Sequence, residues 1–286
     1  MTPWGWAVLA VVAAGVAMGA WVRFGPRPTG EGPWILEHRV APEFLVEGST
    51  LTVRGFRNFA WTSATAFEPH WEERRFDLDR VERVWYVLAP LARGWRGPAH
   101  ALVSFEFEDG AFLAISVEAR RREGRRYGFV KGILRRFELI YVAGDERDLV
   151  GLRALHRGGD VYAYPAAASP EGARALLLEM AQAANRLREH PEHYHTIWNN
   201  CTTRIVDHVN RVTSRPVGRS WRILLSGYSD VLAHELGFLD GAGPDGTPGA
   251  GGIRELRARW YVNERAREWA DADDFSIRIR EPSRSE

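Results

Sequence analysis

Alternating apolar and polar positions in the middle of the chain predict an antiparallel hairpin. Residues 99–107 and residues 112–118 each place apolar side chains at every second position, which is the period of a half-buried strand. The two apolar sets share a face only if Phe105 pairs with Leu113, because a slip of one residue turns every side chain over. This register leaves a three-residue loop that ends at Gly110, where such loops hold a left-handed residue.

Other periodic segments indicate both strands and helices. Ser169 and Pro170 are typical of an N-cap and a first helical position. Strands are predicted at residues 49–57, 77–90, 137–142 and 160–164, and helices at residues 169–190, from residue 201 onward, at 229–239 and at 253–270. The pattern therefore predicts an α+β protein in which helices pack on an antiparallel sheet.

Composition divides the chain into segments, because clusters of Gly and Pro interrupt regular structure. We expect, in order, an N-terminal membrane anchor, a spacer and lead-in, the main domain, a Gly/Pro-rich loop, and a C-terminal helix with a tail. These segments cover residues 1–24, 25–48, 49–240, 241–252 and 253–286. The main domain is long enough to bury a full core.

The first segment resembles a membrane span. The run from Trp4 to Val22 carries no charge and has tryptophans near both ends, and its length is close to the roughly 20 residues that cross a hydrocarbon core. A cleavable signal peptide is the alternative, since Ala17 and Gly19 are small enough for a cleavage site. Arg23 and Arg27 follow the run, and the positive-inside rule taken alone would place the domain in the cytoplasm.

Charge does not select a partner. The chain has 286 residues, of which 38 are basic and 37 acidic, so no strong net field attracts nucleic acid. The arginine-rich run from Arg120 to Arg126 is typical of a solvated turn, although beside a membrane it would meet lipid phosphate. A single cysteine excludes an intramolecular disulfide and is compatible with the cytoplasm or the cell envelope.

That cysteine, Cys201, falls where a loop turns into a helix. Asn199 and Asn200 precede it as typical N-cap residues, and apolar residues recur at helical spacing after it. The helix dipole and the free N–H groups of a first turn favour the thiolate, which is the nucleophilic form. A buried cysteine acting as a small hydrophobe is the alternative, but Thr202 and Thr203 offer little apolar surface for a core position.

The hairpin register sets His100 opposite Glu118 at the open end of the two strands. A histidine oriented by a carboxylate activates the nucleophile of a catalytic triad, whereas an exposed cross-strand ion pair is the plainer interpretation. His193 and His195, in the loop before the cysteine, stay open as alternative bases. His208 lies two helical turns, roughly 10 Å, beyond the cysteine, which is too far for direct proton transfer.

Donors for an oxyanion are expected around the cysteine. The backbone N–H of Cys201, with help from Asn199 or Asn200, would form an oxyanion hole, and Thr202 and Thr203 would help to position the site. The histidines of the preceding loop lack a carboxylate or thiolate at ligand spacing. We therefore expect no metal and no other cofactor.

Four short segments together resemble a known family. They are Asn199-Asn200-Cys201-Thr202-Thr203, Ala99-His100 at the head of a strand, Ser116 to Arg120, and Arg57-Asn58-Phe59. The pattern resembles the bacterial family of the Lnb N-terminal periplasmic domain, from about Ser49 to Ser229. The resemblance implies a circularly permuted papain-like fold related to NlpC-type thiol enzymes, with the histidine before the cysteine in the chain.

The resemblance also implies an activity, since Lnb is a lipoprotein N-acyltransferase. A periplasmic domain anchored in the inner membrane would use Cys201 as nucleophile, His100 as general base and then acid, and Glu118 to orient the histidine. The cysteine would take an acyl chain from a phospholipid as a thioester and pass it to the N-terminal amine of a lipoprotein. The alternatives are a thiol amidase or peptidase acting on envelope peptides, and a non-catalytic domain that binds lipid or a partner.

Overall fold

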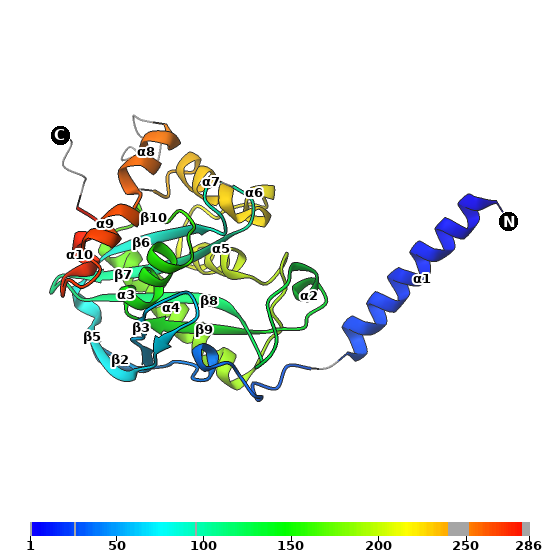
Figure 1. The fold of residues 1–286 in the computed structure, drawn as a ribbon, viewed down its shortest axis with the longest axis horizontal. Coiled ribbons are helices and arrows are strands. Elements are labelled where there is room, and N and C mark those ends of the chain that lie inside the picture. Colours follow the sequence, from blue (N-terminus) through cyan, green and yellow to red (C-terminus); the bar gives the residue numbers. More distant parts are fainter. Residues whose placement is uncertain (1, 26, 95, 240–251, 282–286) are drawn as a thin grey trace.

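A sheet of eight strands forms the centre of the part of the chain that the computed structural model describes, namely residues 2–25, 27–94, 96–239 and 252–281 (Figure 1). Seven strands lie in the order β1, β2, β9, β8, β7, β6 and β10, and β5 pairs with β2 as well. Their bounds are β1 Glu43–Glu47, β2 Thr50–Arg57, β5 Trp71–Asp77, β6 Val81–Pro90, β7 Ala99–Phe107, β8 Phe112–Arg120, β9 Glu138–Gly144 and β10 Tyr162–Pro165. A separate hairpin joins β3 Ala60–Trp61 to β4 Phe67–Glu68.

The predicted hairpin and its register are confirmed. β7 and β8 pair antiparallel with Phe105 opposite Leu113. The N–H of Phe107 donates to the carbonyl of Ala111 across the turn, and Gly110 has a φ of 78°. The loop therefore has three residues and ends in the left-handed conformation that glycine adopts most readily.

The sheet is mixed, so the prediction of an antiparallel sheet was wrong at one junction. β2 and β9 run parallel where Arg57 pairs with Gly144. Periodicity within a strand reports which face is buried but carries no information on the direction of its neighbour. Gly144 is required by close packing here, because a Cβ atom would lie 2.5 Å from the carbonyl oxygen of Arg57.

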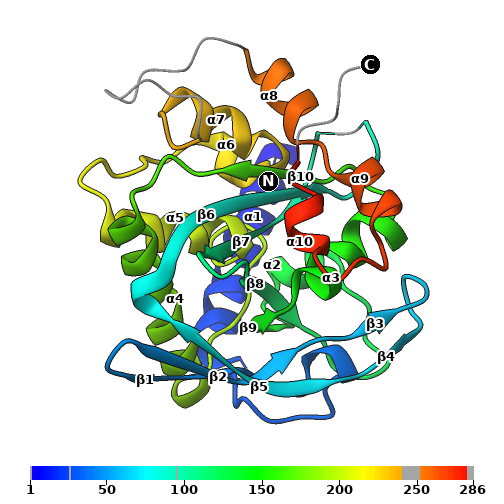
Figure 2. The same ribbon diagram turned by 90° about the vertical axis from the view of Figure 1, so that its left-hand side faces the viewer.

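Two groups of helices cover opposite faces of the sheet (Figure 2). α4 and α5 pack on one face, against odd-numbered side chains of β7 such as Ala101 and Phe105. The other face buries Leu102 in a core formed with α3, the π-helical turn η3, α9 and α10. These elements are α3 Glu146–Leu149, η3 Leu152–His156, α4 Pro170–Glu189, α5 Cys201–Val212, α9 Asn263–Glu268 and α10 Phe275–Arg278. The pleat of β7 thus sends neighbouring side chains into different cores.

Shorter elements complete the fold. They are α2 Phe129–Ile133, α6 Trp221–Leu224, α7 Ser229–Glu235, α8 Ile253–Trp260, and the 3₁₀ turns η1 Leu36–His38, η2 Leu78–Arg80 and η4 Ser226–Tyr228. The single helix expected at residues 253–270 is divided, because Tyr261 is extended and bridges to Tyr162 on β10. The loop expected at residues 241–252 lies outside the described residues except for its last one.

The first helix, α1 Pro3–Phe24, projects away from the body of the molecule (Figure 1). In the described ranges, no helix combines the length and the apolarity that a membrane span needs, so the anchor expected at residues 1–24 is not found. The segment at residues 25–48 contributes η1 and the edge strand β1 to the fold. Its His38 is buried.

A buried ion pair joins the end of β2 to α3. The Nε and Nη2 groups of Arg57 bind the two carboxylate oxygens of Asp148 at 2.7 and 2.8 Å. The same carboxylate accepts the backbone N–H of Phe59 and the indole N–H of Trp61. These four hydrogen bonds replace the water that the carboxylate loses on burial. Removing the carboxylate would leave the charge of Arg57 buried without its counter-ion.

We therefore expect Asp148→Ala to lower the free energy of unfolding by about 3–5 kcal/mol, measured by urea denaturation. Asp79→Ala is the matched control, because Asp79 pairs with Arg174 at the surface and such pairs contribute below about 1 kcal/mol. Equal losses in the two variants would contradict the structural role of the buried pair.

Candidate functional site

Helix α5 begins at Cys201 and is capped by the residue before it. Asn200 is the N-cap, and its Oδ1 accepts the N–H of Thr203 at 3.0 Å. The backbone N–H of Asn200 donates in return to the Thr203 hydroxyl at 2.8 Å, which completes a capping box. The Nδ2 group of Asn200 donates to the Thr196 carbonyl at 2.6 Å and so fixes the preceding loop. Asn200 and Thr203 therefore position the cysteine by holding its helix and loop.

The thiol of Cys201 is buried against β7. Cys201 is 7% exposed, and its sulfur accepts hydrogen bonds from the backbone N–H groups of Ala101 and Thr202. The Thr202 hydroxyl lies 3.8 Å from Sγ. Burial raises the pKa of the thiol above its ordinary value, and this effect outweighs the hydrogen bonds that lower it. The resting thiol is therefore protonated at neutral pH, in contrast to the thiolate expected from the helix dipole.

Two hydrogen bonds in series connect His100 to Glu118 through Ser116, a residue that was not among the predicted site residues. The Nε2 atom of His100 lies 2.8 Å from the hydroxyl oxygen of Ser116, and that hydroxyl donates to Glu118 Oε1 at 2.9 Å. The direct separation of His100 Nε2 and Glu118 Oε1 is 3.9 Å. The expected alignment of His100 with Glu118 is thus present, with Ser116 as the hydrogen-bonded link.

Two further side chains hold the Glu118 carboxylate. Arg153 from η3 donates to Oε1 at 2.8 Å, and His38 Nε2 lies 3.2 Å from Oε2. His38 Nδ1 accepts the N–H of Arg121, so its Nε2 carries the proton and donates to the carboxylate. Burial alone would raise the pKa of Glu118, but the hydrogen bond from His38 and the charge of Arg153 keep it well below its ordinary value.

This network fixes the tautomer of His100. Because the Ser116 hydroxyl gives its proton to Glu118, its oxygen accepts from His100, and Nε2 of the imidazole therefore carries hydrogen. The lone pair is then on Nδ1. Burial and the charge of Arg153 lower the pKa of His100 to about 3. At neutral pH the ring is uncharged and its Nδ1 is in the form that accepts a proton.

The thiol contacts the histidine segment of β7 at the end of the β7–β8 pairing. The last paired residues there are Leu102 and Ser116. Just beyond this pair, Sγ of Cys201 accepts the N–H of Ala101, the residue that follows His100. The pleat directs the His100 ring toward Ser116, on the face opposite the Ala101 side chain. The contact between thiol and histidine segment therefore runs through the backbone of β7.

The other candidate residues have structural partners. The Asn199 amide donates to the His193 carbonyl at 2.8 Å, and its oxygen accepts from Arg204 at 2.5 Å. His195 Nδ1 accepts the N–H groups of residues 197 and 198 and so shapes the loop. His208 is buried with its Nε2 at 2.6 Å from the Tyr141 hydroxyl. Asn199 and these histidines thus serve the loop and the core in this structure.

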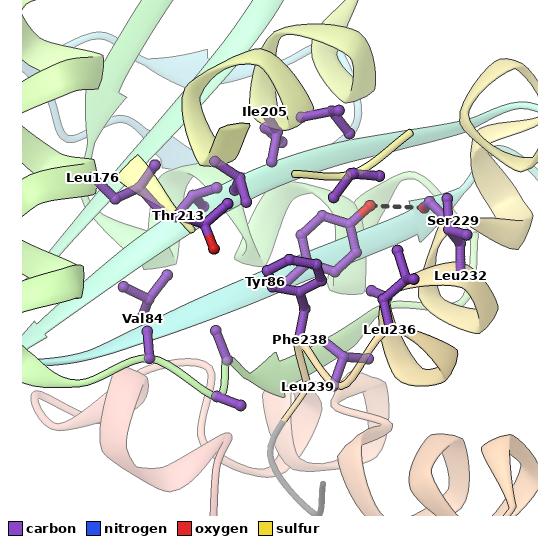
Figure 3. A pocket seen from close by; sticks show the side chains of 18 of the residues that line it. Val84, Tyr86, Leu176, Ile205, Thr213, Ser229, Leu232, Leu236, Phe238 and Leu239 are labelled. Carbon is purple, nitrogen blue, oxygen red and sulfur yellow. Dashed lines mark hydrogen bonds between the residues drawn. The ribbon is translucent and has the colours of Figure 1, made fainter. Parts of the chain in front are cut away.

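An apolar cavity of about 240 Å³ lies between α5, β6 and α7 (Figure 3). Val84, Ile205, Leu232 and Phe238 are among the side chains that line it. Thr202 lines the cavity as well, so the residue whose hydroxyl faces Sγ is part of its wall.

The polar groups of this wall are few. The Tyr86 hydroxyl bonds to Ser229 Oγ at 2.7 Å (Figure 3), which satisfies both groups in apolar surroundings. A hydrocarbon chain would meet aliphatic and aromatic side chains over most of this surface, whereas a peptide would find few hydrogen-bond partners.

Three members of the polar network were not predicted. Ser116 shares a strand face with Glu118 two residues away, so alternation alone could have singled it out. His38 comes from η1, which lies in the segment expected to be a spacer and lead-in, and Arg153 comes from a π-helical turn. Neither carries a local signal that points to Glu118, because tertiary packing brings them there.

Comparison with known families matches residues 67–227 to the Lnb N-terminal periplasmic domain. The matched region covers more than half of the chain and contains His100, Ser116, Glu118 and Cys201. No curated protein and no solved structure matches the chain.

The buried, protonated thiol predicts a distinct pH profile for alkylation. We expect the rate of iodoacetamide reaction at Cys201 to rise with pH and to reach half its maximum above pH 9, because the pKa of the thiol is raised from 9.0 and only the thiolate reacts. Mass spectrometry of native chain at several pH values measures this rate, with the urea-unfolded chain as the control for an ordinary thiol. A half-maximal rate near pH 7 would instead indicate a preformed thiolate.

Proposed function

Because the chain belongs to the family of the Lnb N-terminal periplasmic domain, we propose that this envelope protein is a thiol acyltransferase that carries an acyl chain on Cys201. The donor is a phospholipid and the acceptor is the N-terminal amine of a lipoprotein. The fold is a circularly permuted papain-like one, in which the histidine strand precedes the cysteine helix. The order of His100 in β7 and Cys201 at the start of α5 supports this assignment.

The apolar cavity beside the thiol is the observation that carries the proposal. An acyl-enzyme must hold a hydrocarbon chain out of water for as long as the thioester lives. A cavity with a largely apolar wall favours this by the hydrophobic effect. Thr202 contacts both the cavity and the sulfur, so a chain attached to Sγ would enter directly past it. A peptide substrate would leave this wall without a role.

The first half-reaction forms the thioester. We propose that Nδ1 of His100 comes within reach of the thiol at the open end of the β7–β8 pairing and accepts its proton as Sγ attacks the ester carbonyl of the phospholipid. When the tetrahedral intermediate collapses, the ester C–O bond breaks, and the imidazolium gives its proton to the departing alkoxide of the lysophospholipid. The acyl group is then bonded to sulfur, and His100 is neutral again.

The second half-reaction transfers the chain to the acceptor. The lipoprotein amine attacks the thioester carbonyl while Nδ1 accepts a proton from nitrogen. The C–S bond breaks, the sulfur recovers the proton from the imidazolium, and the product is an amide. The low pKa of His100, about 3, keeps the base neutral between turnovers, and the short-lived imidazolium is stabilised through Ser116 by the Glu118 carboxylate.

Backbone N–H groups of the first turn of α5 stabilise the oxyanion. The early N–H groups of a helix have no intrahelical acceptor, and that of Cys201 lies next to the reacting carbonyl in both half-reactions. The Asn200 amide is already bonded to the Thr196 carbonyl. Its contribution is therefore to hold the loop and helix cap in place.

The thioester is directly observable. Intact-protein mass spectrometry of wild type purified in detergent is expected to show a fatty-acyl adduct that neutral hydroxylamine removes. Cys201→Ala and His100→Gln are expected to abolish the adduct. His70→Gln is the matched control, because His70 is an exposed histidine on the loop before β5. An unmodified wild type that hydrolyses envelope peptides would overturn the proposal in favour of a thiol amidase.

The cavity predicts a dependence on chain length. Ala233→Phe places a ring in the cavity wall and is expected to reduce acyl loading from a long-chain phospholipid at least about tenfold, because the chain loses apolar contact area. Loading from a donor with short acyl chains is expected to change little, which also serves as the control for folding. An equal reduction with both donors would show that the cavity does not hold the chain.

A further inference from the structure

Positive charge is concentrated in one segment that the proposed chemistry does not use. Between residues 121 and 136 the chain has six arginines, one lysine and one glutamate, whereas the net charge of the whole chain is only +1. This segment connects β8 to β9 and contains α2. The rest of the protein is therefore net negative, and the segment is a local basic region on a nearly neutral molecule.

Large apolar side chains are exposed among these basic groups. Tyr127, Phe129 and Val130 are 41%, 52% and 63% exposed. Exposed aromatic and aliphatic groups cost free energy in water unless another apolar phase covers them. Together with the exposed Arg125, Arg126 and Lys131, they form what we call the α2 surface. Mixed basic and apolar side chains of this kind are typical of segments that lie in the interface of a bilayer.

Within the part of the chain that the structure describes, no acidic group neutralises the charges of the α2 surface. Arg121 and Arg122 at the start of the segment pair with Glu37 and Glu138. In contrast, Arg125, Arg126 and Lys131 form no ion pair with any residue that the structure describes. Their charges are available to an external anion.

Direct contacts link the α2 surface to the cysteine. The Thr196 hydroxyl donates to the carbonyl of Phe129 at 3.0 Å, and the Thr196 carbonyl accepts the amide of Asn200, the N-cap of the cysteine helix. Gly132 lets the two segments approach closely, because a Cβ atom there would lie 2.1 Å from Thr196 Oγ1. Whatever the α2 surface binds is therefore held near the reactive thiol.

α1 leaves the body on the same side (Figure 1). Near its end, the Trp21 indole donates to the carbonyl of Leu134 just after α2 at 3.1 Å, and Arg136 stacks on the same indole. Trp4 and Trp6 at the other end of α1 are exposed. Exposed apolar groups of α1 and of α2 thus lie on one side of the molecule.

We infer that the α2 surface docks onto a bilayer containing anionic lipid. Arg125, Arg126 and Lys131 bind lipid phosphates, while Phe129 and Val130 enter the boundary between headgroups and acyl chains. The inference deepens the proposed function, because docking would bring a phospholipid donor to the cysteine loop. The purpose of docking rests on that proposed function. Its test measures membrane contact instead of acyl transfer, so the two fail separately.

A fluorescent probe at Val130 tests this contact in the full chain. In a Cys201→Ser background, Val130→Cys is labelled with an environment-sensitive dye, and emission is recorded with vesicles of phosphatidylethanolamine and phosphatidylglycerol. Asp109→Cys is the matched control, because Asp109 lies in the turn at the far end of β8, about 30 Å away by strand length. We expect a blue shift and quenching by a lipid-phase quencher at position 130 but not at position 109.

The charges are tested in the same assay. We expect a higher lipid concentration to be needed for half of the emission shift, by at least about tenfold, in the triple variant Arg125→Gln/Arg126→Gln/Lys131→Gln. The control variant Arg75→Gln/Arg80→Gln/Arg83→Gln removes equal charge from another part of the surface. It is expected to change this lipid concentration less than twofold. A probe at Val130 that stays in water on vesicle-bound chain would overturn the inference. So would an equal shift with a soluble polyanion alone, whereas loss of thioester formation with the shift intact would contradict only the proposed function.

Discussion

The pairing of β7 with β8 is the constraint on which the candidate site depends. Their register places Ser116 and Glu118 beside His100, and the end of the pairing leaves the N–H of Ala101 free to bind the Cys201 sulfur. The pleat sends Ala101 toward α5 and His100 toward η3, so the thiol and the histidine network are positioned by helices on opposite faces. A slip of one residue would exchange these faces and dismantle both halves of the site.

Burial sets the chemistry of both groups, and it acts in opposite directions on an acid and a base. It raises the pKa of the thiol and lowers that of the imidazole, so the resting pair is neutral on both members. A buried thiolate and a buried imidazolium are thereby avoided. The buried Glu118 remains charged because Arg153 and His38 bind it, and its charge fixes the proton on Nε2 of His100. In the proposed reaction, proton transfer would therefore accompany attack by the sulfur and would not precede it.

The sequence predicted those features that local patterns encode. Alternation gave the hairpin register and hence the alignment of His100 with Glu118, and the residues around Cys201 indicated a helix start. β5 was not predicted, because this edge strand buries little besides Phe76 and so lacks alternation. Contacts between distant segments determine the parallel pairing of β2 with β9, the roles of His38 and Arg153, and the shape of the cavity. The effect of burial on the thiol could not be predicted because it depends on how closely α5 packs on β7.

The most direct test of this account is a crystal structure of the chain with Cys201 alkylated by a reagent that carries a long hydrocarbon tail. The account predicts that the tail passes Thr202 and fills the cavity between Val84, Ile205 and Leu232, with the His100–Ser116–Glu118 hydrogen bonds unchanged. A tail that runs out over the exposed Trp198 and leaves the cavity empty would contradict it.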